Sequence, residues 1–228
     1  MISLDPDESR VLGVLVEKAL TTPGQYPLTL NSLVLGCSQQ SNRDPVEEYD
    51  EPRVYNAIDG LRSKQLVIEA HLSNSRVTKF RHNAREVLGI GTPELVLLVA
   101  LLLRGPQTTG QLRGRASRMH QLESSDAVTT LLKGLMDRED PYVRSVAPDP
   151  GSRAERYAQL LSPDLHPRPQ ASAPAAAAAG PSPVPADGAA AALETRVERL
   201  ETELNRLRSG LTKIAEAIGE PGLIEDEG

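Results

Sequence analysis

Residues 1–162 contain the same series of helix and strand patterns twice. In each copy, three short segments have apolar residues at the i, i+3, i+4 spacing of a helix, and two segments around a polar turn have the pattern of strands. The dipeptide Gly-Leu occurs at the same place in the third helical segment of each copy, at residues 60–61 and 134–135. The chain is therefore expected to fold as two copies of one small unit.

Polar residues with helix-capping chemistry precede the helical segments. Asp5 provides an acceptor for an N-cap, Pro6 suits the first helical turn, and Glu8 stands three residues after the cap, where it can bond back. The other expected caps are Thr29 and Asp50 in the first copy, and Thr92, Thr109 and Ser125 in the second. We therefore expect three helices in each copy, each beginning next to a polar residue.

Each copy ends in a predicted β-hairpin. The expected strand, turn and strand are residues 66–72, 73–75 and 76–81 in the first copy, and residues 142–146, 148–151 and 156–158 in the second. Three helices followed by a hairpin are typical of a winged helix. We predict a mainly α protein with small β-hairpins (α+β), in which two tandem winged-helix domains occupy residues 1–90 and 91–162. The alternative is two unrelated helical bundles, each with an incidental hairpin.

The remainder of the chain has a different composition. Residues 163–192 are rich in alanine and proline, which predicts a flexible linker, and residues 219–228 form an acidic tail. Between them, residues 193–218 have a heptad pattern, which predicts a coiled-coil helix and a homodimer. The dimerisation residues of this pattern are Leu193, Val197, Leu200, Leu204, Leu207, Leu211, Ile214 and Ile218. The alternative is an amphipathic helix that folds back onto the winged helices.

The net charge neither favours nor excludes a nucleic-acid partner. The chain carries a formal charge of −6, but residues 1–162 are almost neutral, with 19 basic and 20 acidic side chains. The acidic excess lies mostly in residues 163–228. Local clusters of charge are therefore more informative than the total.

Basic and polar side chains occur where a winged helix contacts duplex DNA. Such a domain places its third helix in the major groove and its hairpin along the backbone. The candidate contacts are Arg53, Asn56, Arg62, Lys64, Arg76, Lys79, Arg81, Arg113, Arg115, Arg118 and Lys133. Acidic residues such as Asp59 and Asp126 interrupt these surfaces. The leading hypothesis is a non-enzymatic binding protein with a DNA-linked or transcription-related role, and the alternative is a protein-interaction scaffold that binds no nucleic acid.

The sequence predicts no catalytic residues. Cys37 lies in an apolar helical stripe, which favours a buried core residue over a nucleophile. The four histidines lack the spacing of metal ligands and no Gly-rich phosphate loop occurs, so we expect no metal, no cofactor and no small-molecule ligand. Because the chain has one cysteine, no long apolar run and no leader-like segment, it is expected to be cytoplasmic and not to enter a membrane.

Three segments of the first copy resemble the YceH-like family of bacterial proteins, whose biochemical role is unassigned. They are EKALTTP at 17–23, YPLTLN at 26–31 and CSQQSNRDPV at 37–46, and the resemblance continues at 104–108 and 112–113. It implies a tandem winged-helix fold and leaves the function open. The motif also draws attention to loop residues Asn42, Arg43 and Asp44. Such a loop could hold its arginine for an anion or a partner carboxylate, or its side chains could only shape the turn.

Overall fold

The computed structural model describes residues 2–70, 77–149 and 151–166. The candidate contact Arg76, the dimerisation heptad at 193–218 and the acidic tail lie outside the described residues, as does most of the expected linker. The first residues of that linker belong to the folded part, because Pro163–Leu165 form the short 3-10 helix η2 and Leu165 is buried. Within the described part, no helix is long and apolar enough to cross a membrane.

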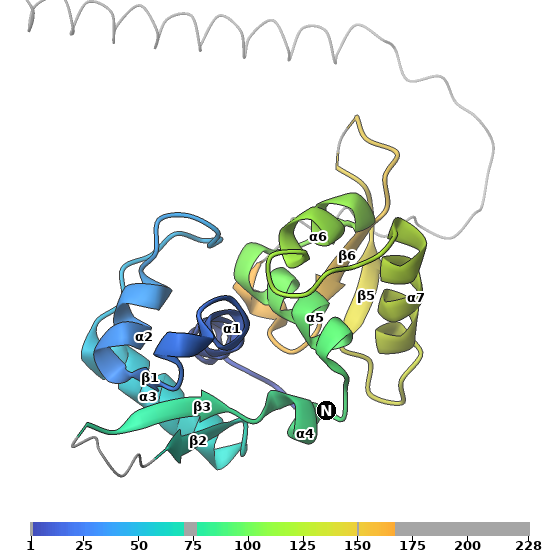
Figure 1. The fold of residues 1–228 in the computed structure, drawn as a ribbon. Helices are drawn as coiled ribbons and strands as arrows, with labels where there is room; N and C mark the ends of the chain where they lie inside the picture. The colour runs from blue at the N-terminus through green and yellow to red at the C-terminus, as the bar shows by residue number, and fades with distance from the viewer. Residues whose placement is uncertain (1, 71–76, 150, 167–228) are drawn as a thin grey trace, which may run out of the picture. The chain divides into compact units, whose positions relative to one another are not determined.

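The two copies have the same order of elements (Figure 1). The first copy consists of α1 (Pro6–Thr21), β1 (Leu28–Thr29), α2 (Leu30–Cys37), α3 (Glu51–Ser63), β2 (Val67–Ala70) and β3 (Lys79–His82), with the 3-10 helix η1 (Pro23–Gln25) after α1. The second consists of α5 (Thr92–Arg104), β4 (Gln107–Thr108), α6 (Thr109–Ala116), α7 (Ser125–Met136), β5 (Val143–Val146) and β6 (Arg156–Gln159). Helix α4 (Ala84–Leu88) connects the copies. The structure thus has the expected α+β character, with helices and small antiparallel sheets.

Each hairpin carries a third strand that the sequence analysis did not predict. The strand orders are β1-β3-β2 and β4-β6-β5, and all pairs are antiparallel. In the first sheet Val67 is opposite His82, and Leu28 is opposite Phe80. In the second sheet Gln107 is opposite Tyr157. Strands β1 and β4 contain two residues each, which is too short for a strand pattern to be recognised in the sequence.

The expected helix caps are confirmed in the first copy. Asp5 and Glu8 form a reciprocal capping box, and the side chains of Thr29 and Asp50 cap α2 and α3. In the second copy the caps lie one residue earlier, at Gly91, Thr108 and Ser124 in place of Thr92, Thr109 and Ser125. Thr108 is preferred over Thr109 because its hydroxyl accepts from the N–H of Gln111, whose side chain bonds back to the N–H of Thr108.

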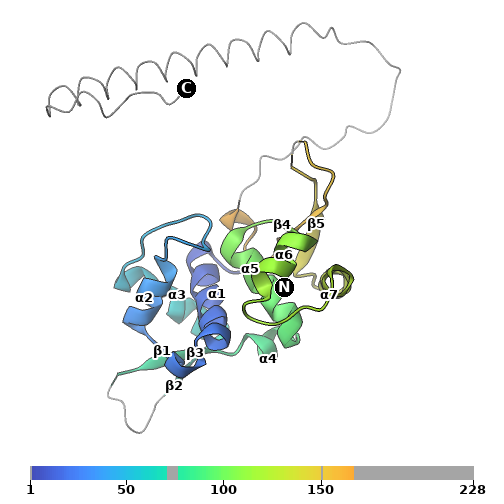
Figure 2. The same cartoon turned by 45° about the horizontal axis from the view of Figure 1, so that its top comes forward.

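Helices α1 and α5 pack against each other at the centre of the folded part, and both views show them side by side (Figure 1, Figure 2). Every residue of α5 from Leu95 to Leu103 is buried, as are residues 8–16 of α1. A Cβ added to Gly13 would lie 2.7 Å from Leu103 Cδ2, so α1 approaches α5 closely at this glycine. The buried residues of both copies form one hydrophobic core.

We expect Gly13→Val to lower the free energy of unfolding by about 1–3 kcal/mol, because the added carbons overlap Leu103 in a packed core. Gly134→Val on α7 is the matched control. No atom lies within 4 Å of a Cβ placed there, so its effect should stay within about 0.5 kcal/mol. Chemical denaturation measures both variants. Equal losses at the two positions would contradict close packing of α1 on α5.

Candidate functional site

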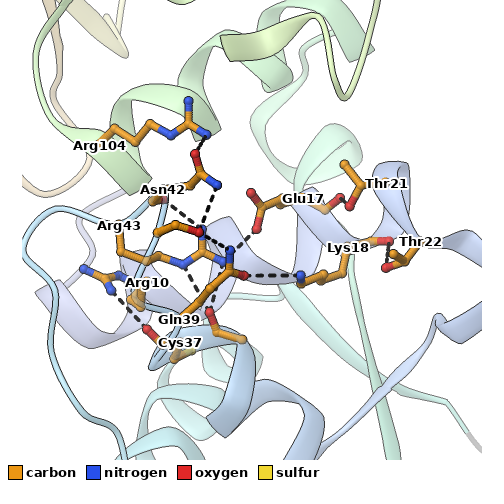
Figure 3. A network of polar contacts seen from close by, with 12 residues as sticks. Arg10, Glu17, Lys18, Thr21, Thr22, Cys37, Gln39, Asn42, Arg43 and Arg104 are labelled. Atoms are coloured by element: carbon orange, nitrogen blue, oxygen red, sulfur yellow. Dashed lines mark hydrogen bonds and ion pairs between the residues drawn. The ribbon is translucent and has the colours of Figure 1, made fainter.

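The loop between α2 and α3 connects the first copy to the second. The N–H of Asp44 donates to the carbonyl oxygen of Leu103 at 2.8 Å. Asn42 has a left-handed φ of 62°, which asparagine tolerates better than most residues, and its Oδ1 accepts from Arg104 Nη2 at 2.6 Å (Figure 3). The family-motif loop therefore contacts the C-terminal end of α5 through both backbone and side chain.

Arg43, the motif arginine, points into the protein. Its Nε and Nη2 donate to the carbonyl oxygen of Gly36 at 3.1 and 3.0 Å, and its Nη1 donates to that of Asn42 at 2.9 Å. Nη2 also forms an ion pair with Glu17 Oε2 of α1 at 2.7 Å (Figure 3). The Arg43 side chain has 0% exposure, so it binds a carboxylate of its own chain and is not presented to an external anion.

The sequence left two alternatives for this loop: its arginine binds an anion or a partner carboxylate, or its side chains only shape the turn. The structure agrees fully with neither. Arg43 does hold a carboxylate, but an internal one. Asn42 bonds across to Arg104 as well as to the neighbouring Ser41, so it does more than shape its own turn. The backbone oxygen of Asp44 accepts from His166 Nε2 at 2.6 Å, which fastens the C-terminal end of the folded part to the same loop.

Two further arginines enclose the end of this loop, and the sequence analysis missed one of them. The Arg10 and Arg53 guanidinium carbons lie 5.6 and 3.9 Å from the centre of the Tyr49 ring. Arg10 is fully buried and donates to the carbonyl oxygens of Cys37 and Pro45. Burial lowers the pKa of Arg10 and raises that of Tyr49. Arg10 is the one arginine within the apolar residues of the first helix, and this was the sequence signal that could have revealed its contact with Tyr49.

Cys37 is buried in the core, as its apolar surroundings predicted. Burial raises the pKa of its thiol to about 12, so the thiol stays protonated at neutral pH. Among residues 2–70, 77–149 and 151–166, no three His, Cys, Asp or Glu side chains are grouped as a metal site would require.

Arg53, the first candidate DNA contact on α3, is held by two carboxylates. Its Nη2 lies 2.6 Å from Asp7 Oδ1 and 2.7 Å from Glu47 Oε2. The hydrogen bond to Asp7 is the main reason that the pKa of Arg53 is raised. The charge of this guanidinium is therefore largely compensated within the chain.

The other cations of α3 are compensated in the same way. Arg62 pairs with Asp59 and Glu69, each at 3.0 Å, and Lys64 pairs with the buried carboxylate of Glu8. The remaining α3 candidate, the neutral Asn56, is exposed. The third helix of the first copy thus presents little uncompensated positive charge.

The hairpin cations of the first copy have different surroundings. Lys79 and Arg81 both lie on β3, where Lys79 is half-buried and Arg81 is exposed. Within the described ranges, neither side chain forms an ion pair or hydrogen bond. These two charges remain available to an external partner.

The candidate DNA contacts of the second copy do not lie together in one group. Arg113 donates to the carbonyl oxygens of Leu122 and Glu123, at 3.4 and 3.0 Å. Arg115 and Arg118 lie at the end of α6 and just after it, whereas Lys133 lies on α7. The structure therefore brings together Arg115 and Arg118 but supplies no contact that joins Lys133 to them.

Arg115 and Arg118 line a hollow that the sequence analysis did not foresee. The other lining residues are Glu17, Lys18, Thr21, Gln39, Asn42, Arg104 and Met119. The hollow has an empty volume of about 360 Å³, including the part open to solvent. Figure 3 shows its α1, loop and α5 side chains meeting at one place. Both copies contribute to the walls, so no single local pattern outlines the site, although six of its nine lining residues lie in the YceH-like segments 17–23, 37–46 and 104–108.

The hollow is electropositive. The pKa of Arg104 is lowered, first by burial and then by the nearby charges of Arg115, Arg43 and Arg118, while Glu17 acts in the opposite direction. A lowered pKa means that the surroundings disfavour the protonated cation. Arginine nevertheless remains charged at neutral pH, so these guanidinium groups repel one another.

We expect Arg43→Met to lower the free energy of unfolding by about 3–5 kcal/mol, because it removes one partner of a buried ion pair and leaves two carbonyl groups without donors. Arg62→Met is the matched control. Its two ion pairs are solvent-exposed, so its cost should be at most about 1 kcal/mol. Similar losses for both variants in urea denaturation would argue against a structural role specific to Arg43.

Acidification should destabilise the fold through two histidines. Burial lowers the pKa of His82 and of His166 from 6.5, and the Nδ1 atoms of both rings are buried without a partner in the described part of the chain. Below pH 6.5 the unfolded chain binds protons that the folded chain does not, so stability falls as the pH falls. The limit is about 1.4 kcal/mol per pH unit for each histidine. Chemical denaturation at pH 7, 6 and 5 should show the free energy of unfolding falling with the pH. His166→Gln should make this fall smaller. An equal fall in the variant would contradict a role for His166.

Comparison with known proteins identifies relatives along most of the chain. The model of the family described as "Protein of unknown function, DUF480" matches residues 4–171. The UPF0502 protein of Pelobacter propionicus is 43% identical over 205 residues, which cover 90% of this chain and 93% of the relative. That of Shewanella pealeana is 41% identical over 217 residues, which cover 93% and 99%. In agreement with the YceH-like motifs, the chain belongs to the DUF480, or UPF0502, family of bacterial proteins.

Proposed function

We propose that each copy is a winged helix and that the protein binds duplex DNA without catalysing a reaction. The observation that carries the proposal is the shared topology. Both copies have the order helix, strand, helix, helix, strand, strand, and in both sheets the first strand pairs with the last. This arrangement supports a third helix and a hairpin placed side by side, which are the two surfaces that such domains use on DNA.

The charge distribution of the first copy favours the hairpin as the main backbone contact. The α3 cations Arg53, Arg62 and Lys64 are paired with carboxylates, whereas Lys79 and Arg81 on β3 are unpaired within the described residues. Contacts with phosphates provide affinity and contacts with base edges provide specificity. We therefore assign phosphate contact to β3, and base contact to the exposed Asn56, whose amide can pair with adenine.

The heptad at residues 193–218 supports a dimeric form of this binding protein. It repeats apolar residues over almost four heptads, a pattern that two parallel helices bury between them. A dimer would place two sets of winged helices on one duplex, and the Ala/Pro-rich linker sets how far apart they can lie.

Fluorescence anisotropy with a mixed-sequence duplex over a salt series tests the proposal. We expect binding that weakens with salt, and Lys79→Ala/Arg81→Ala should reduce the steepness of log K against log salt by about 2, because each lost phosphate contact contributes about 0.9. Arg85→Ala removes an exposed cation of α4, which is neither a third helix nor a hairpin, and should leave the slope unchanged. Sedimentation of the same full-length samples should give the mass of a dimer.

Absence of duplex binding at low salt would overturn the DNA proposal, and a monomer mass would overturn the dimer. A partner protein on the α2–α3 surface is the second candidate. Leu35 on α2 and Tyr55 on α3 are 68% and 48% exposed, and compensated charge next to exposed apolar side chains suits a protein interface better than a phosphate backbone.

A further inference from the structure

We propose that the hollow between the two copies binds the phosphate group of a small molecule. This site is independent of the proposed DNA contact, because its residues come from α1, the α2–α3 loop, α5 and the end of α6, and not from the hairpin strand β3. Its walls include four cationic side chains, namely Lys18, Arg104, Arg115 and Arg118.

The positive charge of the hollow is not balanced by its own walls. Glu17 is the one carboxylate among the lining residues, and it forms an ion pair with Arg43, which lies behind the wall. In the described part of the chain, none of the four lining cations forms an ion pair. On α3 and at its C-cap, by contrast, Arg53, Arg62 and Lys64 are all paired with carboxylates.

The hollow also holds more hydrogen-bond donors than the protein uses. A guanidinium has five N–H groups. Arg104 uses one nitrogen to bond Asn42, and Arg115 uses one to bond Gln107 Oε1 at 3.0 Å. Arg118 has no hydrogen bond within the described ranges. The Lys18 ammonium lies 3.5 Å from Gln39 Oε1, a long contact that leaves most of its donor capacity unused.

A phosphate dianion fits this set of groups by charge and by geometry. It offers several acceptor oxygens on one compact centre, and it would offset the charges of Arg115, Arg43 and Arg118, which together with burial, the larger cause, lower the pKa of Arg104. A neutral ligand would leave the cations uncompensated. Guanidinium groups bind phosphate oxygens in pairs, which explains why three of the four cations are arginines.

Binding would also connect the two copies. Lys18 and Asn42 belong to the first copy, whereas Arg104, Arg115 and Arg118 belong to the second. A ligand that contacts both sides binds only when the α1–α5 packing is intact. Phosphate should therefore raise the thermal midpoint of unfolding as its concentration rises.

Isothermal titration calorimetry of the full-length protein with inorganic phosphate at low ionic strength tests the proposal. We expect saturable binding with one phosphate per chain, and at least about tenfold weaker binding for Arg118→Gln and for Arg104→Gln. Arg118→Gln is the cleaner variant, because Arg118 makes no intramolecular hydrogen bond in the described part, so the fold should be preserved. Arg144→Gln, an exposed arginine on β5, should bind phosphate as the unmodified protein does.

Absence of phosphate binding overturns the proposal, as does binding that both hollow variants retain in full. A parallel titration with duplex DNA distinguishes a site for a free phosphate group from a site for the nucleic-acid backbone. If Arg118→Gln weakens duplex binding and inorganic phosphate does not bind, the hollow is part of the DNA surface and the small-molecule site is wrong. If phosphate binding depends on Arg118 and no duplex binds, the phosphate site in the hollow is supported and the DNA proposal is wrong.

Discussion

The close packing of α1 on α5 is the contact on which the rest of the structure depends. Gly13 allows this approach, since any larger side chain there would overlap Leu103. Each fully buried leucine or valine at this interface contributes about 1.5–3 kcal/mol, so the central helices join two small units that individually have little core. The packing also brings the α2–α3 loop to the end of α5, and thereby creates the hollow.

Arginines stabilise that loop from both sides. Arg43 and Arg10 are buried in the first copy and donate to carbonyl oxygens at the end of α2 and in the loop, so that these groups are hydrogen-bonded away from water. Arg104 bonds the same loop from the second copy. Arg43 of the YceH-like motif therefore has an architectural role, whereas other residues of the same motif segments line the hollow, namely Glu17, Lys18, Thr21, Gln39, Asn42 and Arg104.

Compensation of charge separates the surfaces of this protein into two kinds. The cations of α3 are held by carboxylates, which reduces their attraction for a phosphate backbone and leaves exposed apolar groups such as Tyr55 nearby. In the described part of the chain, the cations of the hairpin strand β3 and of the hollow form no ion pair. A count of basic residues along the sequence treats these groups as equal, although they differ in what they can bind.

The sequence by itself determined the three helices of each copy, the caps of the first copy and the two hairpins, because each depends on residues within a few positions of one another; the short helix α4 was not predicted. It missed strands β1 and β4, which exist only through their pairing with distant strands. It also could not show which cations are free. Arg43 and Glu17 are 26 residues apart, Arg53 and Asp7 are 46 apart, and Lys64 and Glu8 are 56 apart. Only tertiary packing brings such partners within bonding distance, so the structure alone decided which of these charges are paired within the chain.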